Sequence, residues 1–119
     1  MATSLQIVFD CADPDKLATF WAATLHYKQQ TSAIVDPDGV GARIFFQRVP
    51  DEKTVKNRVH LDLNIGGGWG TPPEERRRRI DAEVDRAVRL GARKARTVEE
   101  RGGYFVNLFD PEGNEFDIH

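Results

Sequence analysis

The stretch DPEGNEFDIH, residues 110–119, has the same outline as the earlier stretch DPDGVGARIFFQ, residues 36–47. Each begins with Asp-Pro, an acidic residue and glycine, a combination typical of a tight turn, because proline presets φ and glycine tolerates positive φ. Residues suited to a β-strand follow each turn. The chain therefore contains the same turn-and-strand unit twice, which predicts a repeated module.

The residues before the second turn predict the rest of that module. RVHLDLNI, residues 58–65, alternates apolar and polar side chains, as a strand with one buried face does. After the glycine-rich loop GGGWG, apolar residues at helical spacing predict a helix from about residue 73 to residue 90. RKARTVEE, residues 93–100, and GYFVNLF, residues 103–109, are predicted strands. The module thus contains a strand, a helix and three further strands.

The first half of the chain shows a similar order of elements. SLQIVFDC, residues 4–11, alternates like a strand, and Asp13 is a good N-cap for a helix that should end near His26. KQQTSAIV, residues 28–35, reads as one strand, and ARIFFQRV, residues 42–49, reads as another. Few letters are shared between the halves, so the repeat is one of pattern.

Composition points to one globular domain spanning residues 1–119, with module one at about 1–50, a linker at about 50–57 and module two at about 58–119. A net charge of −2 gives no electrostatic reason to expect nucleic acid or an anionic membrane as a partner. Cys11 is the only cysteine, which excludes an internal disulfide and a cysteine-rich zinc site. Without a secretory signal or a long apolar run, a cytoplasmic location is expected.

Three stretches together resemble the vicinal oxygen chelate superfamily, which includes glyoxalase I, bleomycin-resistance proteins and extradiol dioxygenases. They are RIFFQRVP at 43–50, NRVHLDL at 57–63 and NLFDPEGNEFDI at 107–118. The similarity is greatest to the short glyoxalase-like branch. It implies an α+β fold in which two tandem βαβββ modules form a cup-shaped mixed sheet, and it favours a homodimer.

The resemblance also implies a set of metal ligands. Carried over by position, these are Gln6, Gln47, His60 and Asp117 for one divalent ion such as Zn, Ni, Fe or Mn. The set departs from the usual pattern, because Gln47 replaces a glutamate and Asp117 is a shortened fourth ligand. Amide oxygens are weak ligands for such ions, so a protein without a metal is the alternative. No catalytic residue is identified.

Other residues are candidates for binding a small-molecule substrate inside the cup. They are Phe45, Asp62, Trp69 and Asn107. Asp62 and Asn107 are equally explained by the polar face of a strand, and Trp69 by a lid or by a contact between subunits. His119 is expected to be exposed, with a role as an additional ligand as the alternative. The run of arginines at 76–79 is expected to be a solvated helix face, because glutamates lie four residues away.

Two functions follow from the resemblance. The first is a metal-assisted lyase, isomerase or dioxygenase-like enzyme that acts on a small polar organic molecule. The second is a metal-free module that binds or sequesters a small molecule, as bleomycin-resistance proteins do. Without the resemblance, a ferredoxin-like α+β interaction domain is a third reading. The sequence leaves open whether the protein is an enzyme and which substrate it takes.

Overall fold

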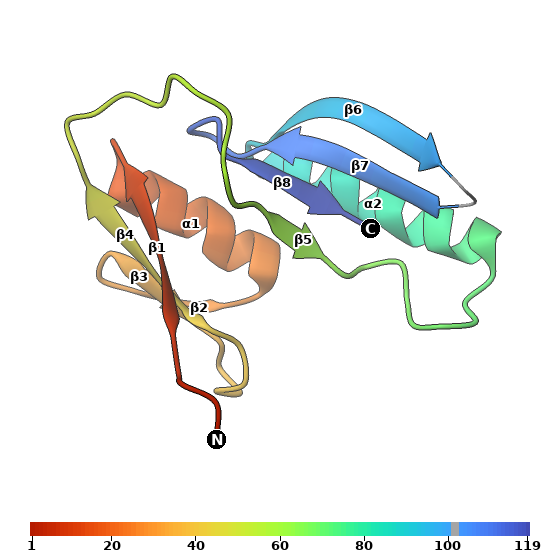
Figure 1. Cartoon of the computed structure of the whole chain (residues 1–119), viewed down its shortest axis with the longest axis horizontal. Helices are drawn as coiled ribbons and strands as arrows, with labels where there is room; N and C mark the ends of the chain where they lie inside the picture. Colours follow the sequence, from red (N-terminus) through yellow and green to blue (C-terminus); the bar gives the residue numbers. More distant parts are fainter. Residues whose placement is uncertain (101–102) are drawn as a thin grey trace. The chain divides into compact units, whose positions relative to one another are not determined.

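The computed structural model describes residues 1–100 and 103–119. The chain divides into two compact units, Met1–Lys53 and Thr54–His119, called module one and module two below. Each module contains one helix and a four-stranded sheet, as Figure 1 shows. In the part of the chain described, no helix is both long and apolar enough to cross a membrane.

Module one has the order βαβββ. Its elements are β1 (Gln6–Cys11), α1 (Pro14–Leu25), β2 (Lys28–Gln30), β3 (Ala33–Val35) and β4 (Arg43–Arg48). The strands lie in the order β1-β4-β3-β2, with β1 parallel to β4 and the other neighbours antiparallel. The predicted turn between β3 and β4 is present, with Gly39 at φ 72°.

The prediction of a single strand over residues 28–35 is wrong, because this stretch forms the β2–β3 hairpin. The chain turns at Thr31 and Ser32, and Ser32 adopts a φ of 54°. The polar run Gln-Gln-Thr-Ser therefore contains a turn that lacks the glycine or proline by which turns are usually predicted.

The core of module one lies between α1 and the sheet. The helix starts at the predicted cap, where the Lys16 amide donates to Asp13 Oδ1 over 3.2 Å, and ends at His26, whose φ is 58°. Trp21 is fully buried, and its ring meets that of Phe9 edge to face with 5.6 Å between centroids. Because Phe9 points toward the helix, Gln6, Val8 and Asp10 lie on the opposite face of the sheet.

Module two repeats this topology. Its elements are β5 (Leu61–Leu63), α2 (Pro73–Leu90), β6 (Arg93–Glu100), β7 (Gly103–Phe109) and β8 (Glu115–Ile118). The strand order β5-β8-β7-β6 matches that of module one, and β5 is again parallel to β8. The fold is therefore α+β with two βαβββ modules, as predicted.

The core of module two lies between α2 and the face of the sheet that carries alternate residues of β7 and β8. It is formed by Ile80, Val84, Ala87, Val106, Leu108, Phe116 and Ile118. Regular strand pairing in β5 covers only Leu61–Leu63, less than the predicted strand at 58–65. On α2, Arg79 pairs with Glu75 over 2.6 Å, in agreement with the predicted solvated face.

Candidate functional site

The candidate site lies on the polar face of module two, where β5 and β8 run side by side. Asp62 is opposite Asp117 in this parallel pair. Phe116 and Ile118 are fully buried in the core, so the strand alternation places Asp117 on the other face of the sheet. His60 precedes β5 by one residue and lies on the same face as Asp62. The predicted residues His60, Asp62 and Asp117 thus come from two adjacent strands.

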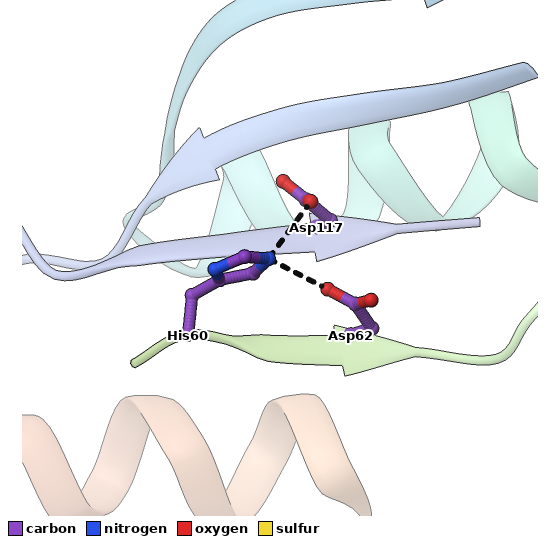
Figure 2. A group of neighbouring side chains, drawn as sticks. All are labelled: His60, Asp62 and Asp117. Carbon is purple, nitrogen blue, oxygen red and sulfur yellow. Dashed lines mark ion pairs between the residues drawn. The ribbon is translucent and has the colours of Figure 1, made fainter. Parts of the chain in front are cut away.

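The three side chains converge on one point, as Figure 2 shows. His60 Nε2 lies 3.1 Å from Asp62 Oδ1 and 3.3 Å from Asp117 Oδ2. One potential ligand atom from each residue lies within 4.8 Å of the others. We call these three residues the His/Asp cluster.

Asp117 is held more firmly than its partners in the cluster. Its side chain is 15% exposed, compared with 43% for His60 and 51% for Asp62. Its Oδ1 accepts a hydrogen bond of 2.7 Å from Asn107 Nδ2, and Asn107 is its neighbour on β7. This bond orients Oδ2 toward His60, the arrangement by which a second residue commonly fixes a metal-binding carboxylate.

His119, expected from the sequence to be exposed with a role as an additional ligand as the alternative, lies beside the cluster, and its side chain is 39% exposed. Its Nε2 lies 3.9 Å from Asp62 Oδ2. This nitrogen atom is buried and has no hydrogen-bond partner among the described residues. The signal in the sequence is its spacing, since residues 117 and 119 of one strand share a face.

The two distances from His60 Nε2 to the carboxylates match the spacing of neighbouring ligands of one metal ion. Two adjacent donors, each about 2.1 Å from an ion, lie about 3.0–3.4 Å from each other. The distances from His60 Nε2 to the two carboxylates, 3.1 and 3.3 Å, fall in this range. Imidazole suits Zn, Fe and Ni, and carboxylate suits Mn and Mg. The residues present therefore fit a divalent ion, and they also satisfy one another as ion pairs.

The predicted ligands of module one have different surroundings. Gln6 Oε1 accepts a hydrogen bond of 2.8 Å from Arg43 Nη1. The Arg43 guanidinium lies 6.0 Å from the centre of the Phe45 ring. Gln47 is exposed, opposite Asp10. Gln6 and Phe45 are thus linked to each other through an arginine that was not among the predicted site residues.

The repeated topology allows the two modules to be compared residue by residue. Asp117 lies opposite Asp62, which is two residues after His60. Gln47 lies opposite Asp10, the fourth residue after Gln6. No single alignment of the modules therefore matches Gln6 with His60 and also Gln47 with Asp117. Matching Gln6 with His60 pairs Asp117 with Phe45.

Trp69, the predicted substrate-binding residue of the glycine-rich loop, is fully exposed. The loop folds back on itself and on the start of α2. Thr71 Oγ1 donates to the Gly68 carbonyl over 2.8 Å, and Arg76 Nη1 donates to the Gly67 carbonyl over 2.9 Å. These bonds fix the loop backbone and leave the indole in solvent.

Several solved structures resemble the chain closely in fold. A glyoxalase/bleomycin resistance/dioxygenase family enzyme from Burkholderia phytofirmans PsJN is 17% identical, with a TM-score of 0.71 over 95% of this chain and 94% of that one. A mutant of the fosfomycin resistance protein FosX from Listeria monocytogenes, complexed with Mn(II) and 1S,2S-dihydroxypropylphosphonic acid, is 17% identical, with a TM-score of 0.71 over 100% and 90% of the two chains. The oxidase ChaP-H2 is 14% identical, with a TM-score of 0.59 over 98% and 91%.

At these identities the likeness shows a common fold. A comparison with curated proteins found no match. The family model of a glyoxalase-like domain, by contrast, matches residues 6–119, nearly the whole chain and both modules. The chain therefore belongs to the glyoxalase-like domain family.

Proposed function

We propose that the protein is an enzyme that uses a divalent metal ion to act on a small polar organic molecule. The observation that carries this proposal is the His/Asp cluster, in which the imidazole and both carboxylates direct their ligand atoms to one point. His60 and Asp117 would anchor the ion, and Asn107 would keep Asp117 oriented through its hydrogen bond. Gln6 and Gln47 remain candidates to complete the set.

Mn(II) is the first ion to test, because it accompanies an oxygen-rich phosphonic acid in the similar FosX structure. A bound divalent ion would polarise a carbonyl or phosphoryl oxygen of the substrate. The exposure of His60 and Asp62 keeps one side of the cluster open to such a ligand. Lyase, isomerase and oxygenase reactions on a molecule with two neighbouring oxygens are the classes that we propose. Phe45 and Trp69 are further candidates for substrate contact.

Metal analysis of untagged protein tests the proposal. We expect about one divalent ion per chain after incubation with Mn2+ and removal of excess ion, and loss of this ion in the His60→Ala variant. His26→Ala is the matched control, because His26 is an exposed histidine of module one. Metal content that is negligible, or equal in the His60→Ala variant and the wild type, would rule out a metal site at the cluster.

A metal-free binding protein is the second candidate, and the surroundings of Gln6 favour it. The Gln6 amide oxygen is already bonded to a cation, Arg43, and Phe45 offers a ring against which a ligand could pack. This function predicts that a small organic ligand binds equally well with and without a chelator. We further propose a cytoplasmic location and a homodimer. Gel filtration with light scattering would test whether the protein is a dimer.

A further inference from the structure

We propose that the substrate of the metal site carries an additional anionic group, a carboxylate or a phosphoryl group, and that Arg96 binds this group. This inference rests on the proposed function, in that it assumes an ion at the His/Asp cluster, and it narrows the class of substrate. The ion would hold two neighbouring oxygens of the molecule, and the Arg96 guanidinium would hold the anionic group at its other end.

A β-bulge in β6 places Arg96 on the face of the sheet that carries the cluster. Arg96 lies opposite Asn107, and the residue before it, Ala95, is an extra residue in the pairing with β7. With regular pairing, Arg96 would instead lie opposite Val106, which is fully buried in the core on the other face. Bulges are frequent next to active sites, where they re-aim a side chain. The bulge in β6 turns an arginine toward the polar face.

Arg96 is the last of four residues that lie opposite one another across the sheet: Asp62, Asp117, Asn107 and Arg96. Neighbouring strands are about 4.8 Å apart, so the backbone of Arg96 lies about 10 Å from that of Asp117. A long side chain at this position therefore reaches toward a small molecule bound to an ion at Asp117.

The Arg96 guanidinium is available for a ligand. Arg96 is exposed, and its side chain forms no ion pair, hydrogen bond or ring contact with residues 1–100 or 103–119. The other arginine that β6 places on this face, Arg93, lies over the Phe109 ring, 4.5 Å from its centre. The Asn107 amide donates its hydrogen bond to Asp117. Because arginine binds carboxylate and phosphoryl groups through paired N–H donors, an anionic group suits this position.

β6 is the last strand of its sheet, where charged residues also discourage pairing with another chain. Lys94 can serve this purpose as well as Arg96 does. It lies opposite Leu108, however, whose side chain is buried in the core on the other face. Lys94 is therefore a matched control: a basic residue of the same exposed strand that is directed away from the cluster.

Calorimetric titration of the Mn2+-loaded, full-length protein with two pairs of probes tests the assignment. Malate is lactate with an added carboxylate, and 3-phosphoglycerate is glycerate with an added phosphoryl group. Each of the four offers the ion a hydroxyl and a carboxylate oxygen. In at least one pair, we expect the wild type to bind the member with the added group at least about tenfold more tightly. This preference should disappear in Arg96→Gln, be partly retained in Arg96→Lys and persist in Lys94→Gln.

A second measurement observes the contact directly in the wild-type protein, loaded with Zn2+ as a diamagnetic ion. The NMR signal of the Arg96 Nε–H group is identified by its absence from the spectrum of Arg96→Gln. We expect this signal to shift when the preferred probe is added, and to stay in place when the other member of the pair is added.

The outcomes separate this inference from the proposed function. Protein that holds Mn2+ but binds both members of each pair equally, or binds none of the four probes, overturns the inference and leaves the metal site. A preference that persists in Arg96→Gln or is also lost in Lys94→Gln overturns it as well, as does an Arg96 signal that no probe shifts. The absence of any Mn2+ binding by the wild type overturns both.

Discussion

Asp36 and Asp110 hold the two repeated turns with their side chains, and they do so by the same kind of bonds. Asp110 Oδ1 accepts from the amides of Glu112 and Asn114, both at 2.9 Å. Asp36 Oδ1 accepts from the Asp38 amide over 2.9 Å. The sequence predicts both turns because aspartate, proline and glycine favour turn conformations through local interactions. The sequence does not indicate that Asp110 is buried, with an exposed fraction of 3%, because burial depends on tertiary packing.

Replacing Asp110 with alanine should destabilise module two by about 2 kcal/mol, because the substitution leaves the partly buried backbone amides of Glu112 and Asn114 without their acceptor. The free energy of unfolding in urea measures the effect. Asp36→Ala is the matched control in module one and should cost less, since its turn is exposed to water. An Asp110→Ala variant as stable as the wild type would contradict the role given to this carboxylate.

The Asp36 carboxyl should titrate below its ordinary range. Hydrogen bonds from the backbone amides of Gly41 and Asp38 lower its pKa from 3.8. Because the pKa is lower in the folded state than in the unfolded state, Asp36 contributes stability at neutral pH. This contribution is lost as the pH falls through the folded-state pKa. A carbon NMR titration of the carboxyl group measures this pKa, and a value at or above 3.8 would contradict the prediction.

The candidate ligands differ in how much of their position local sequence patterns predict. The resemblance in sequence indicated His60 and Asp117, and strand alternation placed Asp62 on their face. That these three side chains meet depends on the parallel pairing of β5 with β8, a contact between residues distant in the sequence. The position of His119 depends on backbone bonds to Leu63 and Ile65, which no local pattern reveals.

Among the elements, the helices were predicted best and the short strands worst. α1 and α2 carry their own start and stop signals, including the Asp13 cap and Gly91 at the end of α2. The β2–β3 hairpin turns at Ser32 without a glycine, so the pattern of the sequence conceals it. β5 is short because its regular pairing with β8 covers only the pairs from Leu61–Phe116 to Leu63–Ile118, and this length is set by the tertiary structure.

Helix α2 and strand β7 are joined by a contact that should be visible in an alkaline titration. The Tyr104 hydroxyl donates a short hydrogen bond to Asp81, and the Arg77 guanidinium lies 4.3 Å from the centre of the Tyr104 ring. Desolvation by burial, followed by the bond to Asp81 and its negative charge, raises the pKa of Tyr104 from 10.0 to about 12. The tyrosine therefore stabilises the fold below pH 10, and this contribution is lost as the pH rises through 12.

Replacement of Asp81 by asparagine should lower the pKa of Tyr104, because the carboxylate that opposes ionisation is removed. Absorbance at the phenolate wavelength follows the titration, and Tyr27→Phe removes the only other tyrosine signal. Asp85→Asn is the control for loss of an exposed carboxylate of α2. An unchanged Tyr104 pKa in Asp81→Asn would show that the carboxylate does not influence the ring in solution.

Across the whole molecule, the two modules share a topology but not their polar chemistry. Both have the strand order in which the first strand of the module lies beside the last. The repeat could be predicted from the paired turns and the alternating strands, because these patterns are local. The division of chemistry could not be predicted, because it depends on register: Asp62 faces Asp117 in module two, whereas in module one Val8 faces Phe45 at the matching position and Arg43 lies opposite Gln6.

This division predicts that a metal ion will protect one module from hydrogen exchange and not the other. The His119 amide, bonded to Leu63, has a counterpart in module one, where the Val49 amide donates to the Cys11 carbonyl at the same point of the repeat. An ion at a free concentration one hundred times its dissociation constant stabilises the bound state by about 2.7 kcal/mol. Amides near the ion that exchange through local opening should therefore slow by up to about a hundredfold.

Exchange of individual amides, followed by NMR with and without Mg2+ or Zn2+ as diamagnetic ions, compares these two positions directly. His119 and Ile65 should exchange more slowly in the presence of the ion, and Val49 should be unaffected. In the His60→Ala variant the slowing at Ile65 should decrease. Equal slowing at Val49 and His119 would mean that module one also responds to the ion, as expected if Gln6 and Gln47 were ligands. The exchange pattern thus tests, in the unmodified chain, whether the two halves of the repeat have separate roles.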